Sequence, residues 1–109
     1  MARTGTTDTY FLFENQTTDA NSTAVQVNYP SKTAVVKAVG TFDGASLKFQ
    51  TTFPQSSTWI DIPDYSGAVL ALEDPGQRAL LYLVQNEQVR AVLTGSGAST
   101  NISVSLEIT

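Results

Sequence analysis

Histidine and cysteine are both absent from this chain of 109 residues. A hydroxyl or thiol nucleophile of the Ser-His-Asp or Cys-His type needs an imidazole base, and transition-metal sites rely largely on imidazole and thiolate ligands. The composition therefore excludes these classes of active site and metal site, and it also excludes stabilisation by disulfides. We expect that the chain is not an enzyme and that it binds no metal ion and no cofactor.

Charge is also scarce, because 15% of the residues are charged and the net charge is −4, with a pI near 4.4. The six Lys and Arg residues are scattered, so they form neither a basic patch for nucleic acid nor a polybasic cluster for a lipid surface. The apolar runs are too short to span a membrane. Met1–Asp8 lacks the apolar core of a secretory signal, so we expect folding in a reducing cytoplasm.

Short segments rich in β-branched, aromatic and alternating apolar residues predict an all-β fold with one core. We expect a single antiparallel β-sandwich of about eight short strands, with jelly-roll or immunoglobulin-like topology. The sandwich covers residues 9–109, and residues 1–8 form an extended N-terminal arm. Besides a central hairpin, the predicted strands are Thr9–Glu14, Thr23–Asn28, Trp59–Ile62, Ala68–Leu72, Ala79–Val84, Val89–Thr94 and Ile102–Ile108.

Thr33–Phe53 has the pattern of a β-hairpin, with Asp43-Gly44 as its two-residue turn. A one-residue slip of this register would move every apolar side chain to the opposite face of the sheet. The predicted pairs on the buried face are Phe42 with Ala45, Gly40 with Leu47, Ala38 with Phe49 and Val36 with Thr51. The predicted pairs on the other face are Thr41 with Ser46, Val39 with Lys48 and Lys37 with Gln50.

The densest acidic group is Asp61, Asp64, Glu73 and Asp74, close in sequence to Trp59. Paired carboxylates beside an aromatic residue are the elements of a glycosidase, and carboxylates also bind calcium. The spacing matches no calcium loop, and aspartates beside Gly and Pro commonly shape turns through their own side chains. We therefore interpret Asp64 and Asp74 as turn residues, and Asp61 and Glu73 as residues that face solvent.

Gly95–Thr100 (GSGAST) is rich in glycine, as are loops that bind phosphate. The segment lacks the lysine of a P-loop and opens no helix. We interpret it as a hairpin loop.

Four aromatic residues could bind glycans by stacking on sugars, and they are Trp59, Tyr65, Tyr29 and Tyr82. A single tryptophan in a small sandwich more often packs in the core or in an interface. Glycan binding is therefore the alternative function.

The segments Ala68–Leu72 and Ala79–Val84 are apolar at every position, and Val89–Thr94 is nearly so. A two-layer sandwich buries one face of each strand, so the second apolar face needs a loop or another subunit to cover it. Three such strands in one small domain favour a subunit interface, and we expect a homo-oligomer.

Three stretches resemble the small structural proteins of tailed bacteriophages. They are Gly40–Leu47 (GTFDGASL), Trp59–Ile62 (WIDI), and Val89–Gly95 (VRAVLTG) leading into Ile102–Leu106 (ISVSL). The similarity spans about residues 33–108, and its motifs are turn glycines, one tryptophan and a terminal hairpin. Proteins of this kind include capsid decoration or cement proteins, which form dimers or trimers on the outer shell, and tail and fibre components.

The resemblance implies a virion protein on the outer capsid surface that clamps neighbouring major capsid protein subunits. A tail or fibre component, or a glycan-binding module for host attachment, is the alternative. On the leading hypothesis the arm lies on the capsid and the two-sided apolar strands join copies of the protein. The expected interface residues are Met1, Ala2, Arg3, Thr4, Leu81, Leu83 and Trp59.

Overall fold

The computed structural model describes residues 8–27, 32–52, 56–64, 66–73, 77–84 and 86–108. Four of the predicted interface residues, Met1 to Thr4, lie outside these ranges. Asp8, which the sequence assigned to the arm, is the first residue of a strand. No helix among the described residues is long and apolar enough to cross a membrane.

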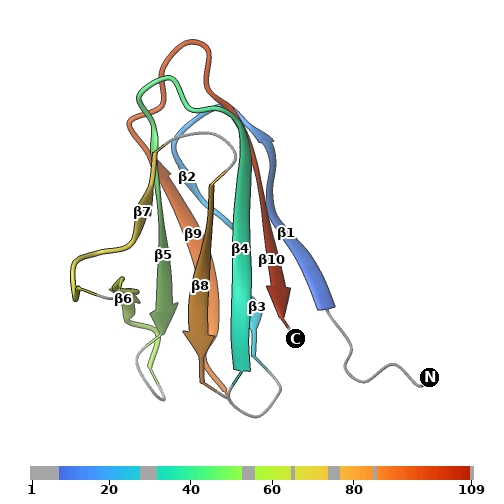
Figure 1. Cartoon of the computed structure of the whole chain (residues 1–109), viewed down its shortest axis with the longest axis vertical. Coiled ribbons are helices and arrows are strands. Elements are labelled where there is room, and N and C mark those ends of the chain that lie inside the picture. Colours follow the sequence, from blue (N-terminus) through green and yellow to red (C-terminus); the bar gives the residue numbers. More distant parts are fainter. Residues whose placement is uncertain are drawn as a thin grey trace.

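Two antiparallel sheets make up the structure and confirm the predicted β-sandwich (Figure 1). Sheet A has the order β1-β10-β4-β8, and its strands are β1 (Asp8–Gln16), β10 (Asn101–Ile108), β4 (Lys32–Thr41) and β8 (Gln77–Leu83). Sheet B has the order β2-β9-β5-β6, and its strands are β2 (Ala20–Asn21), β9 (Gln88–Thr94), β5 (Ser46–Thr52) and β6 (Trp59–Asp61). Two further strands, β3 (Val25–Gln26) and β7 (Ala71–Leu72), pair with β9 and β5.

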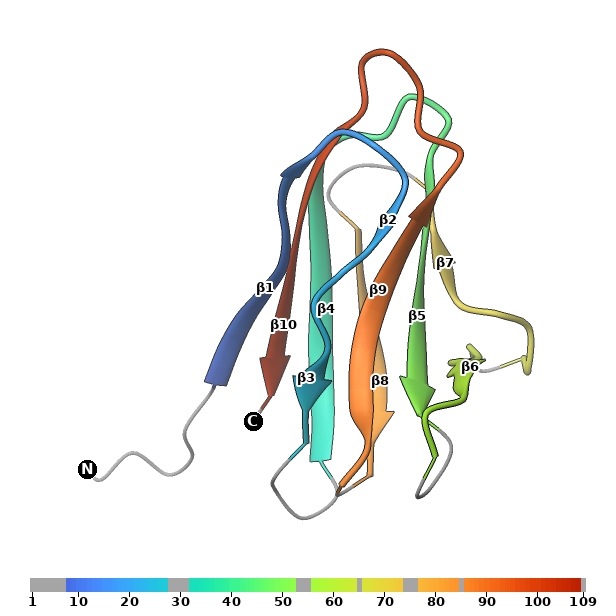
Figure 2. The ribbon, with the colours of Figure 1, turned by 180° about the vertical axis from the view of Figure 1, so that it is seen from behind.

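The order of the strands is that of a jelly roll. The ten strands of the described chain occupy eight positions, because β2 and β3 share one edge of β9, and β6 and β7 share one edge of β5. The first strand then pairs with the last, and most connections cross from one sheet to the other (Figure 2). An immunoglobulin sandwich instead pairs its first strand with its second. The structure therefore selects between the two topologies that the sequence left open.

The core lies between the sheets, and it is formed by alternate residues of the long strands. In β10 the apolar residues Ile102, Val104, Leu106 and Ile108 are buried, as the alternation predicts. Phe49 and Leu47 of β5 meet them from the other sheet and are fully buried. Burial of each such side chain stabilises the fold by about 1.5–3 kcal/mol, so these two layers account for much of the stability.

The predicted pairing of the central hairpin is wrong, because β4 and β5 belong to different sheets. Ala38 pairs with Val104 on one side and with Gln77 on the other, while Phe49 pairs with Ala91. Both hydrogen-bonding edges of β4 are thus occupied by β10 and β8, which leaves no edge for β5. Six of the eight residues predicted for the buried face are buried, whereas Gly40 is exposed and Thr51 is half-buried. The buried faces of the two strands meet across the core rather than side by side.

The turn between the two strands is nevertheless present. Asp43 and Gly44 have φ angles of 48° and 85°, and the N–H of Ala45 donates to the carbonyl of Phe42 at 2.9 Å. These are the positive φ values that a two-residue turn of this type needs. The turn brings together only Phe42 and Ala45, and the chain crosses there from sheet A to sheet B.

We expect Gly44→Val to lower the free energy of unfolding by about 1–3 kcal/mol, because a β-branched residue is strained at this φ. A Cβ at position 44 would approach only the carbonyl oxygen of Gly95, at 4.0 Å, so the cost is conformational rather than steric. Urea titration measures the change. Gly44→Asn is the control, since asparagine tolerates positive φ and should lose less. A valine variant as stable as the wild type would contradict the assignment.

Candidate functional site

An apolar strip lies on the outer face of sheet A, along β4 and β8. It consists of Val35, Leu80 and Tyr82, and Leu80 and Tyr82 are 62% and 66% exposed. Val35 pairs with Leu80 across the two strands. The strip exists because Ala79–Val84 is apolar at every position, so burial of one face of β8 leaves apolar side chains on the other.

The side chains of β8 that point outward are not those of the predicted interface residues, Leu81 and Leu83, but those of the residues one position before each. Leu81 and Leu83 are 1% and 0% exposed and belong to the core. They pack in the core of their own chain and do not project from the outer face of the sheet. An interface on β8 must instead use Leu80 and Tyr82.

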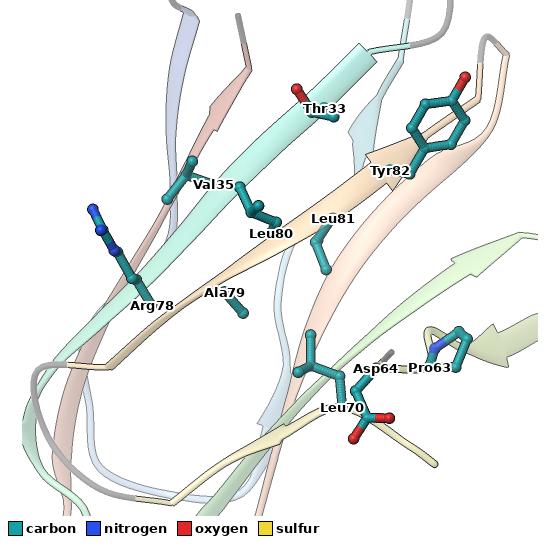
Figure 3. A pocket seen from close by; sticks show the side chains of 10 residues that line it. All are labelled: Thr33, Val35, Pro63, Asp64, Leu70, Arg78, Ala79, Leu80, Leu81 and Tyr82. Carbon is teal, nitrogen blue, oxygen red and sulfur yellow. The ribbon is translucent and has the colours of Figure 1, made fainter. Parts of the chain in front are cut away.

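A groove of about 740 Å³ runs beside the apolar strip, between β8 and the segment that connects β6 to β7 (Figure 3). Ala79 and Leu81 line it from β8, and Pro63, Asp64 and Leu70 line it from the connecting segment. Pro63 forms an isolated bridge with Val69, which closes this segment into a small projection. The groove and the strip together form one continuous surface on both sides of β8.

Asp64 holds the shape of that projection. Its Oδ1 accepts hydrogen bonds from the N–H of Ser66 at 2.8 Å, from the hydroxyl of Ser66 at 2.7 Å and from the N–H of Ala68 at 3.2 Å. These bonds, that of the Ser66 hydroxyl first, lower the pKa of Asp64. The predicted role of Asp64 in a turn is therefore confirmed, whereas Asp74 lies outside the described residues.

The outer face of sheet B carries a chain of paired polar groups. The Nε and Nη2 atoms of Arg90 donate to Gln50 Oε1 at 3.0 and 2.8 Å, and Gln50 Nε2 donates to Asp61 Oδ1 at 2.9 Å. Lys48 Nζ lies 3.2 Å from the same carboxylate oxygen. The register of sheet B places Arg90 of β9, Gln50 of β5 and Asp61 of β6 in one row, and Lys48 lies two residues before Gln50 on the same face of β5.

Asp61 is half-buried in this row rather than freely facing solvent. The hydrogen bond from Gln50 is the largest effect on its pKa and lowers it, and Lys48 adds to this against the opposing effect of desolvation. A glycosidase acid needs a raised pKa so that it holds a proton near neutral pH. The shift at Asp61 has the opposite direction. Within the described residues, no three acidic side chains gather around a space for a metal ion.

Trp59 lies next to this row, and Arg90 covers its ring. The guanidinium carbon of Arg90 is 4.1 Å from the ring centroid, which is the geometry of a cation–π contact. Trp59 is half-buried. One face of the indole is thus occupied by the protein's own cation and does not form an open platform for a sugar.

Two carboxylates accept hydrogen bonds from backbone amides of the Gly95–Thr100 loop. Asp19 accepts hydrogen bonds from the N–H groups of Gly95 at 3.2 Å and Ser96 at 2.8 Å, and Asp43 accepts one from Ser99 at 2.9 Å. The amides that could hold a phosphate are therefore paired within the protein. The prediction of a hairpin loop is wrong, since β9 and β10 belong to different sheets and the loop joins the two layers.

We expect the stability of the protein to fall at acid pH through Asp19. Hydrogen bonds from Ser96, its hydroxyl first, and from Gly95 lower the pKa of Asp19 below 3.8. The unfolded chain therefore takes up the proton more readily. The contribution is complete above the unfolded value and is lost as the pH falls through the lower pKa of the folded state. Melting temperatures from about pH 5 down to about pH 2 measure the loss, and Asp19→Asn should flatten the profile. An unchanged profile in the variant would contradict this role.

No protein-family model matches the chain, and no curated protein and no solved structure matches it. What defines the class of this protein is the sandwich itself, with jelly-roll strand order, an exposed apolar strip and an adjoining groove. Of the predicted acidic group, Asp61 and Asp64 are paired within the protein. The sequence did not show which residues form the strip, because the run Ala79–Val84 has no polar residue to mark its outer face.

Proposed function

We propose that this protein is a virion structural protein of a tailed bacteriophage that acts by binding rather than by catalysis. In the leading form of the proposal it is a capsid cement protein on the outer capsid surface, where it bridges and stabilises neighbouring major capsid protein subunits. The apolar strip of Val35, Leu80 and Tyr82 is the observation that carries the proposal. Soluble monomers rarely expose large contiguous apolar patches, so apolar side chains gathered on one face favour a partner.

Two further features support a binding role. The jelly roll recurs in viral capsid proteins, although this is an analogy of fold and not of site. One charge near the strip is neutralised, because the Nζ of Lys37 in β4 lies 2.9 Å from Glu107 Oε2, while Arg78 of β8 lies opposite Lys37. Association through such a surface rests on apolar packing, so it should weaken only mildly as salt rises.

The second candidate is a glycan-binding module, since lectins also use the jelly roll. Tyr82 favours it, because this ring is 66% exposed and lies beside the groove. Tyr29 and Tyr65 lie outside the described residues. The arrangement at Trp59 argues against this candidate, since Arg90 occupies one face of the ring. A tail or fibre location is a third form of the same structural role.

The test is to purify particles from the source of the gene and to measure the molar ratio of this chain to the major capsid protein. A near-stoichiometric ratio supports a cement protein, and a few copies per particle support a tail or fibre component. Absence from particles, together with binding to a glycan array that Tyr82→Ala abolishes, would overturn the proposal in favour of the lectin. Phe11→Ala is the matched control, because Phe11 is 64% exposed at the opposite edge of sheet A.

A further inference from the structure

Three of the four sheet edges in the described chain carry features that prevent pairing with another strand. The edge at β1 has two register shifts, between Phe11 and Phe13 and between Phe13 and Gln16. Both edges of sheet B are broken into strands of two or three residues, namely β2 and β3 on one side and β6 and β7 on the other. Bulges and short edge strands are the usual means by which natural sheets avoid association.

The fourth edge, β8, has none of these features. Its seven residues pair with β4 in an unbroken register, from Leu83 opposite Lys32 to Gln77 opposite Ala38. It contains no proline and no lysine, and Arg78 is its one charged residue. Among the described residues no strand pairs with its other side. A regular, apolar edge of this kind is a template for an added strand.

We propose that the added strand is β8 of a second copy of this chain, paired antiparallel across a two-fold axis at Leu80. Sheet A of one copy then continues into sheet A of the other. A two-fold arrangement closes on itself and uses the same surface twice, so it forms a discrete dimer and not a fibre. The inference goes beyond the proposed function, because it holds whether or not the protein binds a capsid.

The chemistry of the strand fits its own antiparallel copy. With Leu80 on the axis, the two Leu80 side chains face each other, and Arg78 of each copy lies opposite Tyr82 of its partner. Directly opposed side chains in an antiparallel pair have Cβ atoms about 4.5–5.5 Å apart, which allows a guanidinium to contact a tyrosine ring. The two arginines lie at opposite ends of the ribbon, so no like charges oppose each other. The apolar strips of both copies become continuous across the axis.

The position of the groove also favours pairing of β8 with β8 of a second copy. It lies along the open side of this edge, so a strand laid against β8 would cover it (Figure 3). Leu70 and Ala79, which pack against the core but remain partly exposed, would lose contact with water. One pair of strands buries less surface than a standard stable interface. The dimer should therefore depend on concentration.

The absence of native cysteine allows a direct test by disulfide cross-linking. Leu80→Cys places one thiol on the proposed axis, where two copies bring their Cβ atoms close enough for a disulfide. Phe11→Cys is the matched control, equally exposed but on the opposite edge of the same sheet. Under mild oxidation at high protein concentration we expect Leu80→Cys to form covalent dimers at least about tenfold faster than the control.

Sedimentation of variants without cysteine gives an independent readout. The wild type should shift from 11.7 kDa towards twice that mass as its concentration rises, and Tyr82→Asp should remain monomeric. Phe11→Asp should dimerise as the wild type does. Circular dichroism checks that each variant is folded, which is expected because both side chains are exposed. A wild type that is monomeric at all concentrations, a trimer, or equal cross-linking of the two cysteine variants would overturn the inference.

Discussion

Replacing Leu81 with aspartate is expected to unfold the protein. Leu81 is 1% exposed and packs in the core between the sheets. The variant must therefore bury an unpaired carboxylate or detach the edge strand β8 from sheet A. Loss of the leucine side chain costs about 2–5 kcal/mol, and the buried charge adds several more. The sum is comparable to the whole stability of a small domain, about 5–15 kcal/mol. Circular dichroism and urea titration measure the outcome.

The neighbouring variant Leu80→Asp is the control for this prediction. Leu80 is on the same strand but points outward, so its replacement should change the free energy of unfolding by less than about 1 kcal/mol. The same variant should lose the proposed dimer. If both variants unfold, the assignment of inward and outward faces along β8 is wrong.

Gly40→Ala is expected to have the second largest effect. Gly40 has a φ of 119° and pairs with Ile102 of β10, and a Cβ there would collide with the backbone of Asn101 and lie 3.2 Å from the Cα of Ile102. The conformational strain alone costs about 1–3 kcal/mol. The collision also displaces backbone where the two central strands of sheet A, β4 and β10, pair with each other. We therefore expect a total loss on the order of 3 kcal/mol or more.

Gly67→Ala separates these two contributions. Gly67 has a φ of 89°, but no heavy atom lies within 4 Å of a Cβ at this position. Its replacement carries the conformational cost without the collision. Thermal unfolding of both variants should show the larger loss at Gly40. Equal losses would mean that β10 accommodates the extra carbon without cost.

The sequence predicted that β8 is a strand, but it did not predict which of its side chains point outward. Alternation fixed the inward faces of β10 and β5, where polar side chains mark the outer positions. In Ala79–Val84 every residue is apolar, so no alternation of apolar and polar residues marks the buried face. The choice of Leu81 over Leu80 for the core depends on the pairing of β8 with β4.

The polar row on sheet B was also beyond sequence reasoning. Asp61 and Trp59 stand out as an acid near an aromatic residue, which suggested chemistry. Their partner Gln50 lies on the preceding strand, 11 residues before Asp61, and Arg90 lies on β9. Neither residue carries a local signal of the contact. Only the register of the sheet brings these groups together and satisfies them.

By itself the sequence determined the fold class, the buried face of the alternating strands, the turn at Asp43-Gly44, and the absence of imidazole and thiolate chemistry. These properties depend on residues near one another in the chain or on composition. The tertiary structure alone decided which strands are neighbours, and hence the jelly-roll order and the separation of β4 from β5. The physical reason is that backbone hydrogen bonds are alike in every strand pair, and closing a longer loop adds little cost. The neighbours of a strand are therefore chosen by packing across the whole core.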